Sequence, residues 1–165
     1  MDKLIYKNSL LGVYKSEKGK FKFVKIKHAN YAVVLPFVSK YRILLEIQYR
    51  YVLGKELYEV PGGMMERGES ATDAARRELA EETGYRAKDV RFMFKAYMMP
   101  GTDTSEAHFT IARDMTKGET HFDRNERIRT REISINQAVK LIKSNRITDG
   151  KTIAAILYYK YFYKG

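Results

Sequence analysis

Residues 62–85, GGMMERGESATDAARRELAEETGY, constrain the fold of this 165-residue chain more than any other stretch. Ser70 and Asp73 have the spacing of a helix N-cap and the third residue of its helix. Gly84 stands where a helix commonly ends in the left-handed conformation. The pattern therefore predicts one helix over residues 71–83, preceded by a glycine-rich loop.

Three glutamates crowd the end of this predicted helix. Glu78, Glu81 and Glu82 share a face, because residues three or four apart on a helix are neighbours. Their charges repel one another and also oppose the negative end of the helix dipole. A divalent cation would remove the conflict, since hard ions such as Mg²⁺ bind carboxylate, water and phosphate oxygens. A carbonyl near Gly62 would supply a further oxygen. The alternative is a solvated acidic helix end.

Composition narrows the class of protein. The length suits one main domain, and the chain has no cysteine, which excludes disulfides and thiol nucleophiles. No secretory signal is visible, and the apolar run YAVVLPFV is short and broken by Pro36, so we expect a cytoplasmic protein without a membrane segment. The net charge of +11 suits anionic substrates. The basic residues are scattered and no nucleic-acid-binding motif appears, so we expect no nucleic-acid partner.

Apolar periodicity predicts the remaining elements. A capping box at residues 134–137 opens a helix through Lys143, and a C-terminal helix is predicted over residues 151–163. Strands and helices interleave, which indicates an α/β or α+β fold. The predicted strands cover residues 20–27, 31–38, 42–51, 91–98 and 107–115.

The glycine-rich loop and its helix resemble the Nudix hydrolase box, G-x5-E-x7-R-E-U-x-E-E-x-G-U, in which U is bulky and apolar. Tyr85 is aromatic where an aliphatic residue is usual. The resemblance implies a mixed β-sheet sandwiched between α-helices, and hydrolysis of a nucleoside diphosphate linked to another group, with Mg²⁺ or Mn²⁺ as cofactor. The matching residues are Gly63, Glu69, Arg77, Glu78, Leu79, Glu81, Glu82, Gly84 and Tyr85.

The resemblance also implies a role for each box residue. Glu78 and Glu82 are the principal metal ligands, Glu81 is a further ligand or the catalytic base, and the Gly62 carbonyl is a backbone ligand. The resemblance also implies that Glu69 and Arg77 form an ion pair that orients the loop. The structural residues of the box are Gly63, Glu69, Arg77 and Gly84.

Three features outside the box resemble the ADP-ribose pyrophosphatase branch of the family. They are QYRY at residues 48–51, ahead of LYEVPGG; PGTDTSE, whose Pro100 lies fifteen residues after Tyr85; and FDRNERI at residues 122–128. The resemblance implies that Glu126, with Asp123 in reserve, or else Glu81, is the catalytic base alongside the catalytic ligand Glu82. It implies substrate contacts by Arg50, Glu59, Gly101 and Glu106.

The expected activity is therefore hydrolysis of the diphosphate bond of ADP-ribose, or a close ADP-sugar, to AMP and ribose 5-phosphate. The alternatives are another nucleotide substrate, such as a dinucleoside polyphosphate or an RNA 5′ end, and a non-catalytic nucleotide sensor. By resemblance, residues 1–30 form a small antiparallel sheet that makes a homodimer, and residues 31–165 form the Nudix hydrolase domain. The N-terminal strands could instead extend the main sheet.

Overall fold

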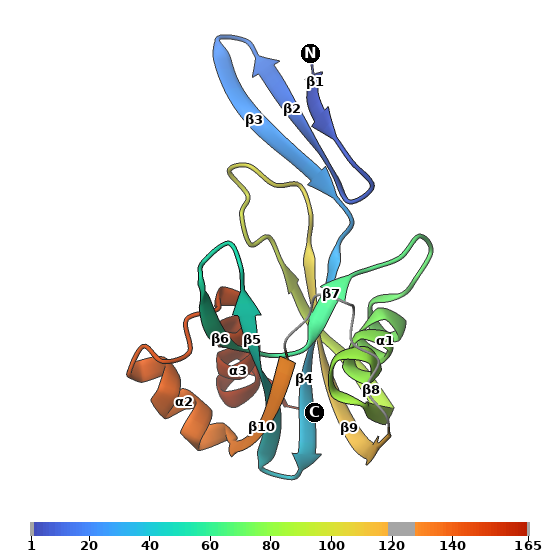
Figure 1. The fold of residues 1–165 in the computed structure, drawn as a ribbon, viewed down its shortest axis with the longest axis vertical. Helices are drawn as coiled ribbons and strands as arrows, with labels where there is room; N and C mark the ends of the chain where they lie inside the picture. Colours follow the sequence, from blue (N-terminus) through green and yellow to red (C-terminus); the bar gives the residue numbers. More distant parts are fainter. Residues whose placement is uncertain (1, 119–127, 165) are drawn as a thin grey trace.

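The computed structural model describes residues 2–118 and 128–164. Within these ranges the chain forms two β-sheets and three helices (Figure 1). In chain order the elements are β1 Asp2–Lys7, β2 Leu11–Lys18, β3 Phe21–His28, β4 Tyr31–Ser39, β5 Arg42–Arg50, β6 Lys55–Glu59, β7 Gly62–Met64, α1 Ala71–Thr83, β8 Tyr85–Ala96, β9 Ala107–Lys117, β10 Ile128–Ser134, α2 Ile135–Lys143 and α3 Gly150–Tyr161.

The first three strands make a separate antiparallel sheet at one end of the molecule (Figure 1). The small N-terminal sheet is thus confirmed, and it does not extend the main one. Two backbone hydrogen bonds tie it to the β8–β9 loop, from the Ile26 amide to the Thr102 carbonyl at 2.7 Å and from the Thr104 amide to the Ile26 carbonyl at 3.3 Å. The loop is therefore attached to the end of β3.

The main sheet is mixed, with the strand order β10-β5-β4-β9-β8, while β6 pairs with β5 and β7 with β4. The β4–β9 pair is parallel, and the other described pairs are antiparallel. Alternate β4 side chains point to opposite faces. Val33 and Leu35 pack in the core beneath α2 and α3, whereas Ala32 and Val34 pack against α1. The predicted sheet between helices is confirmed (Figure 1).

Helix α1 begins and ends where the sequence predicts. The Ser70 side chain accepts a hydrogen bond from the Asp73 amide at 3.2 Å. Gly84 adopts the left-handed conformation with φ 74°, and its amide donates to the Ala80 carbonyl. Leu79 is fully buried against the sheet. Local caps and one buried face thus fix the helix that carries the glutamates.

Helices α2 and α3 close the other face of the sheet. The predicted capping box of α2 is present, with reciprocal hydrogen bonds between Ser134 and Gln137. Helix α3 starts at the N-cap Asp149. None of the helices in residues 2–118 and 128–164 combines the length and hydropathy needed to cross a membrane.

Candidate functional site

A cavity of about 700 Å³ lies where β7, the end of α1 and the start of α3 meet. One wall is built from Gly62 and Gly63 of β7 and from Glu78 and Glu82 of α1. Strand β7 is placed by pairing with β4, and α1 packs on the same strands. The sheet therefore brings the glycine-rich loop against the carboxylates that follow it in the sequence.

Neither glycine leaves room for a side chain, because a Cβ atom at Gly63 would meet the Glu78 carboxylate and one at Gly62 would meet the β4 backbone. A Cβ atom at Gly63 would lie 2.5 Å from Cδ of Glu78. The Gly62 amide donates a hydrogen bond of 2.9 Å to Oε2 of Glu82, which is 6% exposed. The structure thus shows the amide of Gly62 on the carboxylate, and the predicted role of its carbonyl as a metal ligand stays a prediction.

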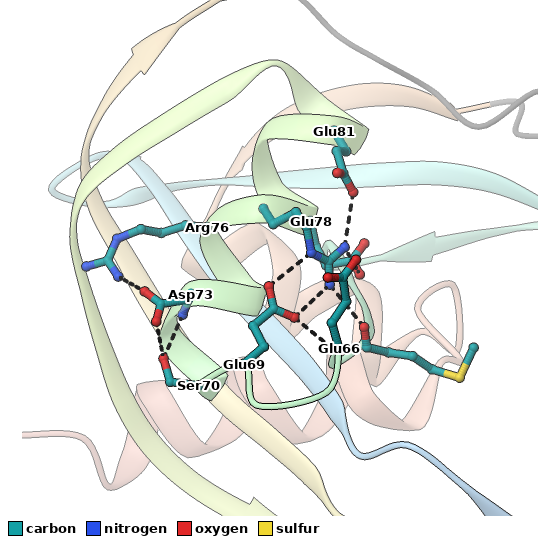
Figure 2. A network of polar contacts seen from close by, with 9 residues as sticks. Glu66, Glu69, Ser70, Asp73, Arg76, Glu78 and Glu81 are labelled. Atoms are coloured by element: carbon teal, nitrogen blue, oxygen red, sulfur yellow. Dashed lines mark hydrogen bonds and ion pairs between the residues drawn. The ribbon is translucent and has the colours of Figure 1, made fainter. Parts of the chain in front are cut away.

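A single guanidinium contacts two of the crowded glutamates, Glu78 and Glu81, and the loop residue Glu69. Arg77 donates two hydrogen bonds to Glu69, at 3.0 and 3.1 Å, one to Glu78 at 2.8 Å and one to Glu81 at 3.2 Å, and it also binds the Met64 carbonyl (Figure 2). The ion pair with Glu69 was expected from the sequence; the contacts with the other two glutamates were not. The hydrogen bond from Arg77 lowers the pKa of Glu69, and the same bond raises the pKa of Arg77.

The three glutamates at the end of α1, Glu78, Glu81 and Glu82, have different surroundings in the structure. Glu78 and Glu82 line the cavity, whereas Glu81 lies outside its lining with a side chain that is 46% exposed. Among the described residues, no three acidic or histidine side chains are placed to hold a metal ion by themselves. Mg²⁺ commonly takes one or two carboxylates together with water and substrate phosphates. Glu78 and Glu82 fit that requirement. The Glu78 carboxylate occupies the space beside Gly63 that a side chain would fill, which supports a role for it as a ligand.

An ion pair between a buried carboxylate and a partly exposed guanidinium positions the cationic side of the cavity. Arg50 donates to both carboxylate oxygens of Glu59, from Nε at 2.7 Å and from Nη2 at 2.6 Å. The Glu59 side chain is 3% exposed and that of Arg50 is 40% exposed. The hydrogen bond to Glu59 raises the pKa of Arg50. Of the four expected substrate contacts, Arg50 lines this cavity, and Glu59 is placed to orient Arg50.

The start of α3 completes this side of the cavity. Asp149 and Lys151 line it. Asp149 accepts hydrogen bonds of 2.8 Å from the amide and hydroxyl of Thr152, and that hydroxyl accepts one of 2.9 Å from the Val60 amide. This chain of bonds joins α3 to the β6–β7 connection. Sequence reasoning missed these residues, although Asp149 followed by Thr152 has N-cap spacing.

The far wall comes from β4 and the β8–β9 loop. Tyr31, Met98 and Asp103 line it. Asp103 pairs with Nε2 of His28 at 2.8 Å and accepts a hydrogen bond of 2.9 Å from the Ser105 hydroxyl. Burial works to raise the pKa of Asp103, but the Ser105 and His28 hydrogen bonds hold it below its usual value. Asp103 lies within the PGTDTSE stretch, but the sequence pointed to Gly101 and Glu106 there; the contact of this loop with the end of β3 places Asp103 at the cavity.

The other expected residues lie elsewhere. Glu106 pairs with Lys95 at 2.9 Å, which lowers the pKa of Glu106, and neither it nor Gly101 is among the lining residues of this cavity. Asp103 is the acidic residue of this loop that reaches the cavity. Glu126 and its reserve Asp123 lie outside the described residues.

Comparison with known proteins agrees with this arrangement. The NUDIX domain family model matches residues 27–156. The methanol dehydrogenase activator of Bacillus methanolicus is 31% identical over 135 residues, and the ADP-ribose pyrophosphatase of Bacillus subtilis (strain 168) is 32% identical over 135 residues. Each alignment covers 81% of this chain and 73% of the relative. The GDP-mannose pyrophosphatase of Escherichia coli O1:K1 / APEC is 33% identical over 139 residues, covering 78% and 72%.

A solved structure shares the fold at lower identity. The crystal structure of an ADP compounds hydrolase superposes with a TM-score of 0.80 at 19% sequence identity. The match covers 97% of this chain and 90% of that chain, so it includes the small N-terminal sheet as well as the main sheet and its helices. At this identity the likeness concerns the architecture alone.

Proposed function

This chain belongs to the Nudix hydrolase family, and we propose that it cleaves the diphosphate bond of ADP-ribose, or of a close ADP-sugar, to give AMP and ribose 5-phosphate. One observation carries the proposal: Glu78, Glu82 and the fixed guanidinium of Arg50 face the same cavity. The clustered negative charge of a diphosphate must be neutralised by cations before water can attack; Arg50 supplies one, and Glu78 and Glu82 would hold a metal ion as another.

We assign the residues of the cavity to phosphate binding, metal binding and proton acceptance. Arg50 presents planar donors that match phosphate oxygens, and Glu59 fixes their direction. Glu78 and Glu82 would hold a divalent cation, for which we propose Mg²⁺ with Mn²⁺ as the alternative. When bound, such a cation neutralises phosphate charge and lowers the pKa of coordinated water. A carboxylate then accepts the remaining proton, and Glu81 and Glu126 stay the candidates for that base.

The adenine nucleotide is supported by the relatives and by the sequence outside the box. One relative is named for ADP-ribose and another for GDP-mannose. The QYR and PGTDTSE stretches resemble the ADP-ribose branch, which favours ADP-ribose over GDP-mannose. Among the described residues every box glutamate is retained, which favours an enzyme over a non-catalytic sensor.

We also propose that residues 1–30 form a homodimer and that residues 31–165 form the catalytic unit. Apolar side chains on β1 and β3 are exposed in the single chain, including Leu4 at 50%, Ile5 at 59% and Phe21 at 78%. A second copy of the chain would cover them. Sedimentation equilibrium tests this, and a monomer at micromolar concentration would refute it. The cytoplasmic location stays a prediction.

The test of the activity is a product assay with Mg²⁺. The substrates are ADP-ribose, ADP-glucose, GDP-mannose, diadenosine polyphosphate and 5′-triphosphate RNA, each with an EDTA control. We expect AMP from ADP-ribose, EDTA sensitivity, and a fall in kcat of roughly 100-fold for Glu82→Gln. Glu132→Gln, in a surface ion pair with Arg42, is the matched control and should keep its rate. Wild-type turnover by Glu82→Gln would refute the assignment of Glu82 as a ligand.

A further inference from the structure

A second cavity, of about 520 Å³, lies at the opposite end of the main sheet. It is lined by the β4–β5 turn, the last part of β9 and Tyr159 of α3. The β4–β5 turn lies at the lower end of the main sheet in Figure 1. Strand β4 runs from one cavity to the other, with Tyr31 at the first and Phe37 at the second. Six residues of strand span roughly 20 Å. A small ligand in one cavity therefore does not touch the other.

Aromatic rings form the walls of this cavity. Phe37 is 4% exposed and contacts Tyr159 of α3 with ring centroids 4.5 Å apart. Tyr41, in the β4–β5 turn, is 64% exposed and adds a third ring to the lining. Aromatic faces and edges of this kind pack well against a flat heteroaromatic ring.

Two cations stand beside these rings. The Lys40 ammonium lies 5.3 Å from the ring centroid of Tyr41, and the Arg113 guanidinium lies 5.7 Å from that of Phe37. Across residues 2–118 and 128–164, neither cation has an ion pair with a carboxylate within 4.0 Å. An arginine fork suits phosphate in particular, and a lysine ammonium binds phosphate as a point charge.

The backbone is irregular on both sides of the cavity. The β4–β5 register shifts between Phe37 and Ser39, and Asp114 has φ 51° within β9 although it is not glycine. Bulges and left-handed non-glycine residues cost energy and gather at functional sites. Asp114 also lines the cavity, and its carboxylate can accept hydrogen bonds from sugar hydroxyls or a base amine.

We propose that this second cavity is a binding site for a nucleoside monophosphate. The base packs against Tyr41 and Tyr159 above the buried Phe37, the phosphate binds Lys40 and Arg113, and Asp114 accepts from the sugar or the base. Each part of the ligand thus meets side chains of matching chemistry. The proposal concerns binding alone and does not depend on the reaction in the first cavity.

Photolabelling with 8-azidoadenosine 5′-monophosphate tests the proposal on the full chain, with EDTA present so that hydrolysis plays no part. We expect saturable label on peptides that contain residues 37–41 or 113–115. AMP should protect them at a concentration at least about tenfold lower than adenosine, because adenosine lacks the phosphate. Lys40→Gln and Arg113→Gln should each weaken AMP protection about tenfold, whereas the control Lys22→Gln, on the N-terminal sheet, should not.

Lys40 is exposed in a turn, so Lys40→Gln keeps the test valid even if Arg113→Gln perturbs packing on Phe37. Three results would overturn the proposal: label confined to peptides of the first cavity, equal protection by adenosine and AMP, or unchanged protection in Lys40→Gln.

Discussion

Replacing Gly63 by alanine should lower the activity of the first cavity while the free energy of unfolding stays nearly the same. The added Cβ would lie 2.5 Å from Cδ and 2.7 Å from Oε2 of Glu78. Ordinary carbon contacts are about 3.5–4.0 Å, so the carboxylate must move by about 1 Å. A displacement of that size in a catalytic group costs on the order of 100-fold in rate. We therefore expect kcat/KM for ADP-ribose to fall about 100-fold.

The change in stability should be small because two effects oppose each other. The φ of Gly63 is not in the left-handed region, so alanine gains about 0.4–1 kcal/mol by restricting the unfolded chain. The displaced Glu78 weakens its contact with Arg77, a partly exposed pair whose loss costs about 1 kcal/mol or less. The sum is near zero, and Tm should change by less than about 4 °C.

Gly62→Ala, unlike Gly63→Ala, should lower the stability of the fold. Its Cβ would collide with the Ala32 carbonyl and lie 3.0 Å from Cα of Val33, both backbone atoms of β4. Backbone cannot rotate away, so we expect a loss of about 1–3 kcal/mol in the free energy of unfolding. The measurements are kcat/KM, Mn²⁺ affinity and thermal unfolding of both variants. Wild-type kcat/KM and Mn²⁺ affinity in Gly63→Ala would refute the reasoning.

Three further predictions concern charge. The lowered pKa of Glu69 means that its ion pair with Arg77 stabilises the fold above about pH 4.5, and that this stability is lost as the pH falls through the lowered value. The free energies of urea unfolding of wild type and Glu69→Gln should therefore converge in acid. A constant difference between them would contradict this. Arg50→Lys loses the bidentate contact with Glu59, so KM for ADP-ribose should rise about tenfold with kcat less affected; steady-state kinetics would show an unchanged KM if Arg50 does not bind phosphate. EDTA should abolish turnover yet lower Tm by no more than about 4 °C. The stabilisation by bound metal, RT ln(1 + [Mg²⁺]/Kd), is near 1 kcal/mol when the Mg²⁺ concentration is a few times Kd. A chain that calorimetry finds unfolded at room temperature in EDTA would refute this.

Features fixed by neighbouring residues were predictable from the sequence. Helix α1 is bounded by Ser70 and Gly84, whose capping roles depend on their own backbone and the adjacent turn. The resemblance to the Nudix box likewise implied the ion pair between Glu69 and Arg77, which lie within one loop and helix. In each case the partners are close in the chain, so a local pattern carries the information.

Features fixed by distant pairing were not predictable. Strand β7 is only Gly62–Met64 and has no strand-like composition; it forms because β4 offers it partners. Asp103 and Asp149 reach the cavity through the β3–loop contact and the docking of α3. The contacts of Arg77 with Glu78 and Glu81 depend on the side-chain conformations that the packed loop imposes.

Arg77 gives the chain its own counter-ion at the crowded end of α1. Folding would then not require the metal ion on which activity depends. Proteins that need a metal to reconcile their ligands remain unfolded without it. Here the guanidinium already binds Glu69, Glu78 and Glu81. Newly made chains would accumulate as a folded reserve when divalent ions are scarce. Ion supply would then set the active fraction of that reserve, and it would leave the abundance of the protein unchanged.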